Sequence, residues 1–202
     1  MSPRPLTRQE SQAQTRARLI ESAERVFVAQ GFLAASIGQI ARAAGYTTGA
    51  VYSNFASKED LGLAVIADRM LRSVQLLQAE LTSVEPTPEA RLRALETWSA
   101  TVLGDENWVV LVTEFLLAAR HNPAVRGQFN AGLRKARTII ACILDEQRKQ
   151  LGVPFPMESK RLAAAVMGLG MGMSVLRISD PELDTATFVE AIGLLLGGLQ
   201  VR

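Results

Sequence analysis

The sequence predicts an all-α protein with a small N-terminal domain, residues 1–60, and a larger helical domain, residues 61–202. Apolar residues recur at spacings of three and four, and no segment alternates in the way typical of a half-buried strand. Proline is excluded from helix interiors, and the eight prolines leave long uninterrupted segments between them. We expect residues 1–12 to be disordered.

The composition is typical of a soluble globular protein, with 48% hydrophobic and 21% charged residues. The single cysteine cannot form an internal disulfide, which fits a reducing compartment. The N-terminal segment has no apolar run of signal-peptide length. The longest apolar stretch, residues 162–176, is shorter than the roughly 20 residues of a membrane span, so we expect a buried helix there. These features predict a cytoplasmic protein without membrane contact.

Three short helices are expected in the N-terminal domain. The first begins near Thr15, carries apolar residues at helical spacing and ends at Gly31. Ser36, with Gln39 three residues later, forms a capping-box pattern that begins the second helix, and Gly45 ends it.

The third helix is capped by Thr47 or Thr48 and turns Val51 and Phe55 toward the core. A long helix follows, from the S-x-x-D pattern at residues 57–60 to about residue 85. Five more helices are predicted, at about residues 88–103, 106–121, 124–151, 157–178 and 184–200.

The three N-terminal helices, with a tight turn at Gly45, have the spacing of a helix-turn-helix motif. In this motif the last helix enters the major groove of DNA with its N-terminal residues at the base edges. Since Val51 and Phe55 face the core, the polar side chains of this helix point outward. Each can bond a phosphate or a base edge: Thr47, Thr48, Tyr52, Ser53 and Asn54.

Other features of this region also favour double-stranded DNA as the partner. Gly49 has no side chain to hold the backbone away from DNA. The helix starts at Ser36, Thr47 and Ser57 offer unpaired N–H groups to phosphates, and Lys58 adds a positive charge. The first quarter of the chain holds six arginines against three glutamates. Taken singly, each serine or threonine is more often a helix cap.

The segment "RLIESAERVFVAQGFLAASIGQIARAAGYTTGAVYSNFASKEDL" resembles the N-terminal DNA-binding domain of the TetR-type (tetracycline repressor-like) transcriptional regulators. The resemblance covers about residues 15–62 and rests on the patterns "A…F…GF", "IA..AG", "G.VY..F" and "SKE.L". It implies an all-helical homodimer that represses transcription until a small ligand binds the larger C-terminal domain.

By this resemblance, DNA contacts fall on Thr47, Thr48, Gly49, Tyr52, Asn54 and Lys58, and we add Ser36 and Ser53 to the expected set. Tyr52 and Lys58 would mostly contact phosphates. The chain departs from the commonest family pattern at Asn54, where histidine is frequent, and at Tyr46, where a small aliphatic residue is frequent. These departures affect which base pairs are read.

The two C-terminal helices carry small residues at spacings of three and four. They are Ala164 or Ala165, Gly168 and Gly172 in one helix, and Gly193 and Gly197 in the other. A stripe of small residues lets another helix approach closely, so we expect a homodimer in which these helices pair with their copies as a four-helix bundle. Packing within one chain is the alternative.

The central helices hold the residues expected to bind an effector. The large or adaptable apolar side chains there are Trp98, Trp108, Leu111, Phe115, Met167 and Met171. They favour an apolar or aromatic small molecule, although each alone is more often plain core. Ligand bound here would shift the helix that begins at Ser57.

No catalytic residue, metal site or cofactor is expected. His121 is the only histidine and lies at an expected helix end, and Cys142 lies in an apolar run as an expected core residue. The "GLGMG" segment lacks the preceding strand and the spacing of a nucleotide-binding loop. Two alternatives remain open: a protein that binds or sequesters small molecules, and a helical enzyme using Glu114 or His121.

Overall fold

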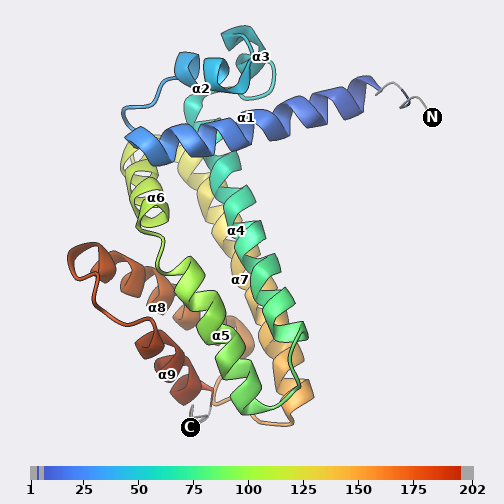
Figure 1. Ribbon diagram of the computed structural model, residues 1–202, viewed down its shortest axis with the longest axis vertical. Coiled ribbons are helices and arrows are strands. Elements are labelled where there is room, and N and C mark those ends of the chain that lie inside the picture. Colours follow the sequence, from blue (N-terminus) through green and yellow to red (C-terminus); the bar gives the residue numbers. More distant parts are fainter. Residues whose placement is uncertain (1–3, 5–6, 197–202) are drawn as a thin grey trace. The chain divides into compact units, whose positions relative to one another are not determined.

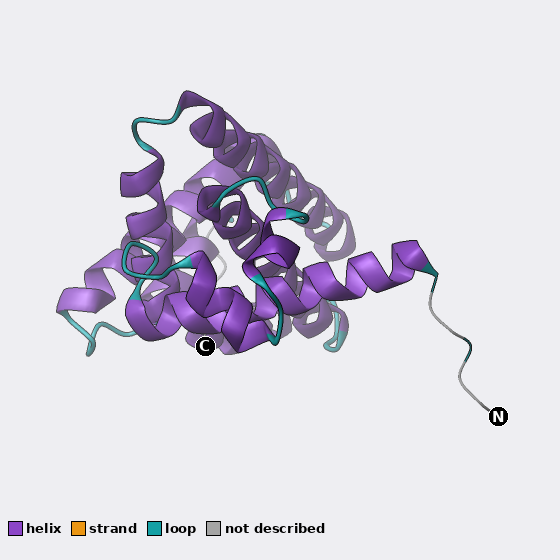
Figure 2. Ribbon diagram, turned by 90° about the horizontal axis from the view of Figure 1, so that it is seen from above, coloured by secondary structure: helices purple, strands orange, loops and turns teal. Residues whose placement is uncertain are grey.

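The computed structural model describes residue 4 and residues 7–196, and every regular element in this part is a helix (Figures 1 and 2). In chain order these are α1 Arg8–Gln30, α2 Ile37–Ala44, α3 Thr48–Tyr52, α4 Lys58–Thr82, α5 Pro88–Val102, α6 Glu106–Ala119, α7 Pro123–Leu151, α8 Ser159–Ser179 and α9 Ala186–Leu195. The prediction of an all-α chain is confirmed. The expected continuation of the last helix to residue 200 falls partly outside the described residues.

The first helix starts earlier than predicted, because Thr7 caps it. Thr7 Oγ1 accepts a hydrogen bond from Glu10 N at 3.2 Å, and Glu10 Oε2 accepts one from Thr7 N at 2.7 Å. This capping box satisfies N–H groups that a helix start leaves unpaired, so α1 begins at Arg8. The expected start at Thr15, and the disorder expected for residues 8–12, were therefore wrong. The disorder expected for residues 1–3 and 5–6 lies outside the described residues.

The chain folds into two compact units that do not follow the order of the sequence. Unit 1 contains the described residues up to Arg69 together with Val110–Phe129. Unit 2 contains Met70–Val109 and the described residues from Asn130 onward. The expected domains, residues 1–60 and 61–202, were assigned by function, and their boundary differs from that of the two compact units. This functional division stays a prediction.

A row of phenylalanines forms the centre of unit 1. The rings of Phe27 and Phe32 have centroids 5.0 Å apart, Phe32 and Phe115 5.4 Å, and Phe115 and Phe129 5.7 Å. Phe32 and Phe115 have no exposed surface. This row packs residues of the α1–α2 loop against α6 and the start of α7, which lie far along the chain.

The helices of unit 1 are held around this row by apolar and charged contacts. α1 packs on α2 and α2 on α3, with Val51 and Phe55 buried as predicted. Glu24 of α1 and Arg69 of α4 form an ion pair with 3.2 Å between Oε1 and Nη1, and both side chains are about four-fifths buried. A pair this far from water is screened less than a surface pair.

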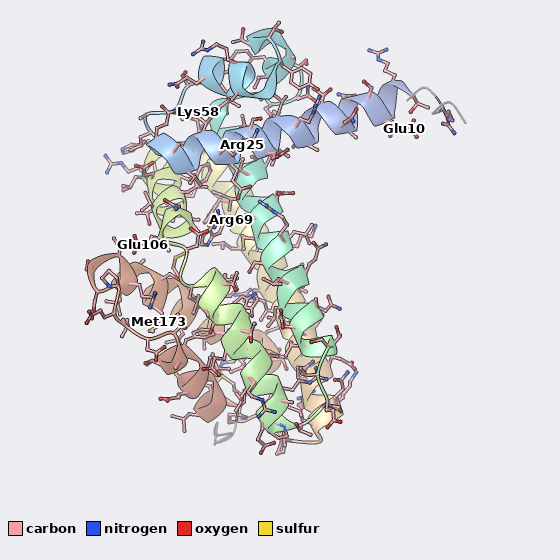
Figure 3. All side chains as sticks on the ribbon, viewed as in Figure 1. Glu10, Arg25, Lys58, Arg69, Glu106 and Met173 are labelled. Atoms are coloured by element: carbon pink, nitrogen blue, oxygen red, sulfur yellow. The ribbon has the colours of Figure 1, made fainter. Side chains whose placement is uncertain are left out.

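Unit 2 has its own apolar core. Met173 of α8 packs there with Leu92, Leu103, Phe188, Val189 and Ile192 (Figure 3). Trp98 lies against Phe188, and its Nε1 donates a hydrogen bond to Ser73 O at 2.9 Å. The indole is therefore fixed at both its apolar and its polar end.

One face of α8 is uncovered in the single chain. By length and composition α8 is apolar enough to cross a membrane, with a mean hydropathy of 1.6 over 18 residues. Only 28% of this 18-residue segment is buried. The prediction of a buried helix was therefore wrong for the chain by itself. The residues that form this exposed α8 face are Ala164, Gly168, Met171, Gly172, Val175 and Leu176.

Gly62 of α4 is required by close packing in unit 1. A Cβ atom at this position would lie 2.7 Å from Phe32 Cε2 and 3.1 Å from Phe115 Cδ2. Overpacking of this kind costs about 1–3 kcal/mol, which exceeds the gain of about 1 kcal/mol from replacing a helical glycine by alanine. We expect Gly62→Ala to lower the free energy of unfolding, measured by urea denaturation.

Gly127→Ala is the matched control, because the position is exposed on α7 and a Cβ there meets nothing within 4 Å. This variant is expected to be about 0.5–1 kcal/mol more stable than the wild type. Equal stability of the two variants would contradict the packing described for Gly62.

Candidate functional site

The helix-turn-helix of unit 1 is built from capped, sharply ended helices. Ser36 Oγ accepts from Gln39 N at 3.3 Å, and Gln39 Oε1 accepts from Ser36 N at 2.8 Å, which confirms the predicted capping box of α2. Gly45 ends α2 in the left-handed conformation, φ 74°, where a side chain would be strained. Thr47 caps α3 by accepting from Ala50 N at 3.2 Å. The turn between α2 and α3 is thus fixed at both ends.

The residues expected to contact DNA are all in unit 1, and most are exposed. Tyr52 is 59% exposed. The other exposed members are Ser36, Thr47, Thr48, Gly49 and Ser53, whereas Asn54 and Lys58 are half-buried. Exposure leaves the first group accessible to DNA, and the contacts themselves stay a prediction.

Asn54 and Ser53 use their side-chain hydrogen-bond donors at the C-terminal end of α3. Asn54 Nδ2 donates to Ala50 O at 2.8 Å and to Ser53 Oγ at 3.3 Å, and Ser53 Oγ donates to Ala50 O at 2.9 Å. A phosphate oxygen accepts hydrogen bonds only, so either side chain would have to rotate to bond one. Thr48 and Tyr52 make no such contact among the described residues.

Lys58 lies beside the loop that links α1 to α2 (Figure 3). Its Nζ donates to the carbonyl oxygens of Phe32 at 3.0 Å, Leu33 at 3.2 Å and Ala35 at 3.0 Å. The ammonium also lies 4.8 Å from the centroid of the Phe32 ring. An ammonium has three N–H donors, so in this conformation all of them serve the protein. The expected phosphate contact of Lys58 stays a prediction.

Two arginines that the sequence pattern did not single out hold α1 to the α2–α3 region. Arg16 Nη1 donates to Asn54 O at 2.8 Å, and its guanidinium lies 4.1 Å from the centroid of the Phe55 ring. Hydrogen bonds from Thr15 and Arg18 lower the pKa of Tyr46 below that of a free phenol. Tyr46, a departure from the family pattern, therefore reaches α1. No local spacing signals contacts between residues this far apart.

The six residues expected to line an effector site fall in both units. Leu111 and Phe115 belong to unit 1, where both are buried, and Phe115 is part of the phenylalanine row. The other four belong to unit 2: Trp98, Trp108, Met167 and Met171. Met171 is 39% exposed and lies on the exposed α8 face. Their role in ligand binding stays a prediction.

Of the residues weighed for catalysis, His121 and Cys142 lie in ordinary surface positions, whereas Glu114 is half-buried. His121 is exposed and its Nε2 accepts a hydrogen bond from Arg120 Nε at 2.7 Å. Cys142 is exposed on α7, so its expected place in the core was wrong. In the described part of the chain, no three His, Cys, Asp or Glu side chains gather in a group able to hold a metal ion.

The N-terminal region matches a known family. The sequence model described as "Bacterial regulatory proteins, tetR family" matches residues 19–65, from within α1 to the first part of α4. The HTH-type transcriptional regulator SrpR of Pseudomonas putida is 52% identical over 56 residues, which are 28% of this chain and 26% of SrpR. The chain therefore spans about a quarter of the length of this curated relative.

Solved structures resemble the chain over most of its length. NemR of E. coli, in its reduced form, has a TM-score of 0.71 at 20% identity, and the match covers 93% of this chain and 100% of NemR. FadR of Bacillus subtilis, solved in complex with stearoyl-CoA, has a TM-score of 0.68 at 19% identity, covering 91% of this chain and 99% of FadR. At such identities the likeness shows the fold alone.

The two threonines at the start of α3 have different structural roles, which substitution by alanine can separate. Thr47→Ala removes the bond to Ala50 N and is expected to lower the free energy of unfolding by about 1 kcal/mol. Thr48→Ala removes an exposed side chain and is expected to change it by less than about 0.5 kcal/mol. Urea denaturation followed by circular dichroism measures both, and a larger loss for Thr48→Ala would contradict the cap assignment.

Proposed function

We propose that this chain is a transcriptional regulator of the TetR family of bacterial regulatory proteins and that it binds double-stranded DNA in the cytoplasm. The observation that carries the proposal is the family match over residues 19–65, which coincides with a capped helix-turn-helix. The short third helix exposes Thr48 and Gly49 at its N-terminal end and Tyr52 at its C-terminal end. These are the residue types that meet phosphates and base edges when such a helix enters a major groove.

The proposed active form is a homodimer assembled through α8 and α9. The exposed α8 face supports this, because a Cβ at Gly168 or Gly172 would meet nothing within 4 Å and Leu176 is 58% exposed. Leu194 of α9 is 63% exposed. Large apolar side chains grouped at helical spacing mark an interaction surface. Gly193 is buried within its own chain and so is not part of this surface, and Gly197 lies outside the described residues.

In the proposed dimer two copies of α3 lie about 34–36 Å apart and read successive major grooves of a pseudo-palindromic operator. The protein acts as a repressor, and a small apolar or aromatic effector lowers its affinity for DNA. Ligand and DNA then favour different states, so each weakens the binding of the other by the same factor. The stearoyl-CoA bound by Bacillus subtilis FadR supports including long-chain acyl compounds in an effector screen.

DNA binding is tested by fluorescence anisotropy with DNA from immediately upstream of the chain's own coding region, beside a scrambled duplex, over a range of salt concentrations. We expect a preference for the upstream or another genomic duplex that persists as salt rises, with a steep dependence of affinity on salt. Equal affinity for all duplexes, including those selected from genomic DNA, would contradict the proposal.

Tyr52→Phe distinguishes a phosphate contact from a structural role in the same assay. The side chain is mostly exposed, so loss of the hydroxyl leaves the fold intact. Loss of a hydrogen bond to a phosphate is expected to weaken binding about tenfold on operator and scrambled DNA alike. The salt dependence stays unchanged, since the hydroxyl carries no charge. Wild-type affinity in this variant would exclude a hydrogen bond from the Tyr52 hydroxyl to a phosphate.

The proposed interface is tested by Leu176→Glu, which places a charge on the exposed α8 face. We expect a monomer by light scattering at micromolar concentration, where the wild type is a dimer, because burying an unpaired carboxylate is costly. Leu71→Glu is the control, since Leu71 of α4 is similarly exposed, at 51%, but lies away from α8 and α9 in the sequence. A dimeric Leu176→Glu variant would argue against this interface.

A further inference from the structure

The loop between α1 and α2 buries the side chain of Phe32 and with it part of the loop backbone, whereas Leu33 is 56% exposed. Phe32 is the second residue of this loop and has no exposed surface. Buried backbone N–H and C=O groups must be paired, or each costs free energy comparable to a lost hydrogen bond. Lys58 satisfies the carbonyl side, with bonds to Phe32, Leu33 and Ala35. The N–H side requires an acceptor.

Glu114 of α6 supplies that acceptor. Its Oε2 accepts hydrogen bonds from Phe32 N at 2.5 Å and from Leu33 N at 3.3 Å. Bonds of N–H groups to an ionised carboxylate are roughly twice as strong as those between neutral groups. The peptide groups of Phe32 and Leu33 are therefore held by a carboxylate on one side and an ammonium on the other.

Gly31 is shaped to admit this carboxylate. Its φ of +83° lies in the region that favours glycine, and a Cβ there would lie 2.8 Å from Glu114 Oε2 and 2.9 Å from Oε1. Three features therefore accommodate the Glu114 carboxylate: the backbone conformation of Gly31, its missing side chain, and the N–H groups of Phe32 and Leu33. The contact joins residues 82 positions apart within unit 1.

We infer that Glu114 is a positioning residue for DNA binding, through which α6 fixes the α1–α2 loop and thereby the start of α2. This inference rests on the proposed function. The loop ends at Ala35, and the next residue, Ser36, caps α2, which is joined to α3 by the tight turn at Gly45. Glu114 contacts no DNA in this role. It sets the orientation in which α2 and α3 meet DNA.

The inference is tested with full-length Glu114→Ala and Glu114→Gln. In Glu114→Ala we expect the amides of Phe32 and Leu33 to exchange with solvent at least tenfold faster by NMR, since their acceptor is gone. We expect operator affinity to fall about tenfold with the salt dependence unchanged. Glu114→Gln keeps an acceptor oxygen without the charge, so its affinity and amide protection lie between those of Glu114→Ala and the wild type.

Glu106→Gln is the matched control, because it makes the same chemical change in the exposed first turn of α6 (Figure 3). It is expected to leave amide protection and operator affinity unchanged. Urea denaturation of each variant gives the folded fraction, to which affinities are referred.

Three outcomes overturn the inference. Wild-type amide protection in Glu114→Ala would show that the carboxylate does not hold the loop. Wild-type operator affinity in the folded fraction, with stability reduced, would make Glu114 structural only. A loss in Glu106→Gln equal to that in Glu114→Gln would mean that charge on α6, rather than the loop contact, matters. If the wild type itself prefers no duplex, the proposed function fails first, and the role of Glu114 in DNA binding fails with it.

Discussion

The burial of Phe32 is the constraint on which unit 1 depends. Burying a phenylalanine in a loop takes part of the neighbouring backbone out of water, and any peptide group left unpaired there costs free energy. Lys58 and Glu114 are those partners, and they come from α4 and α6. The same residue thus links the apolar row of phenylalanines to a charged clamp around the loop. In this unit, burial of the Phe32 ring and pairing of the backbone beside it therefore depend on each other.

This arrangement explains how a very short helix is presented rigidly. α3 has five residues, too few to be stable by its own hydrogen bonds. It is held by the Thr47 cap, by the burial of Val51 and Phe55, and by the bond from Arg16 to the backbone of Asn54. All these contacts lie on its inner side or at its ends. Among the described residues, no hydrogen bond involves the side chains of Thr48 and Tyr52, so both stay available to another molecule.

In unit 2, the helix α8 carries apolar side chains on more sides than the rest of the chain covers. α8 contributes Met173 to the core on one side and leaves Met171, Val175 and Leu176 in contact with water on another. Burying exposed apolar area against another helix is favourable by roughly 25 cal/mol per Å². The small residues between these side chains leave room for a second helix to approach closely. By length and composition α8 could also cross a membrane, although from the sequence its apolar stretch was expected to be too short.

Local patterns in the sequence determined most of the fold. Capping residues, glycine stops, proline positions and apolar spacing act within a few residues, so the starts of α2 and α4 and the core positions Val51 and Phe55 were predictable from neighbours in the chain. The T-x-x-E box at Thr7 is also local and was missed only because no apolar periodicity accompanies it. The family motif likewise lies in one continuous segment.

Tertiary structure alone decided the partners of the charged and aromatic side chains. From the sequence, Lys58 was expected to contact phosphate and Glu114 was considered only for a helical enzyme. Their partners are backbone groups of a distant loop that no spacing marks. The exposure of Cys142 and of α8 depends in the same way on which helix side the rest of the chain covers. Propensity and capping are properties of neighbouring residues, whereas burial and pairing depend on segments that folding brings together.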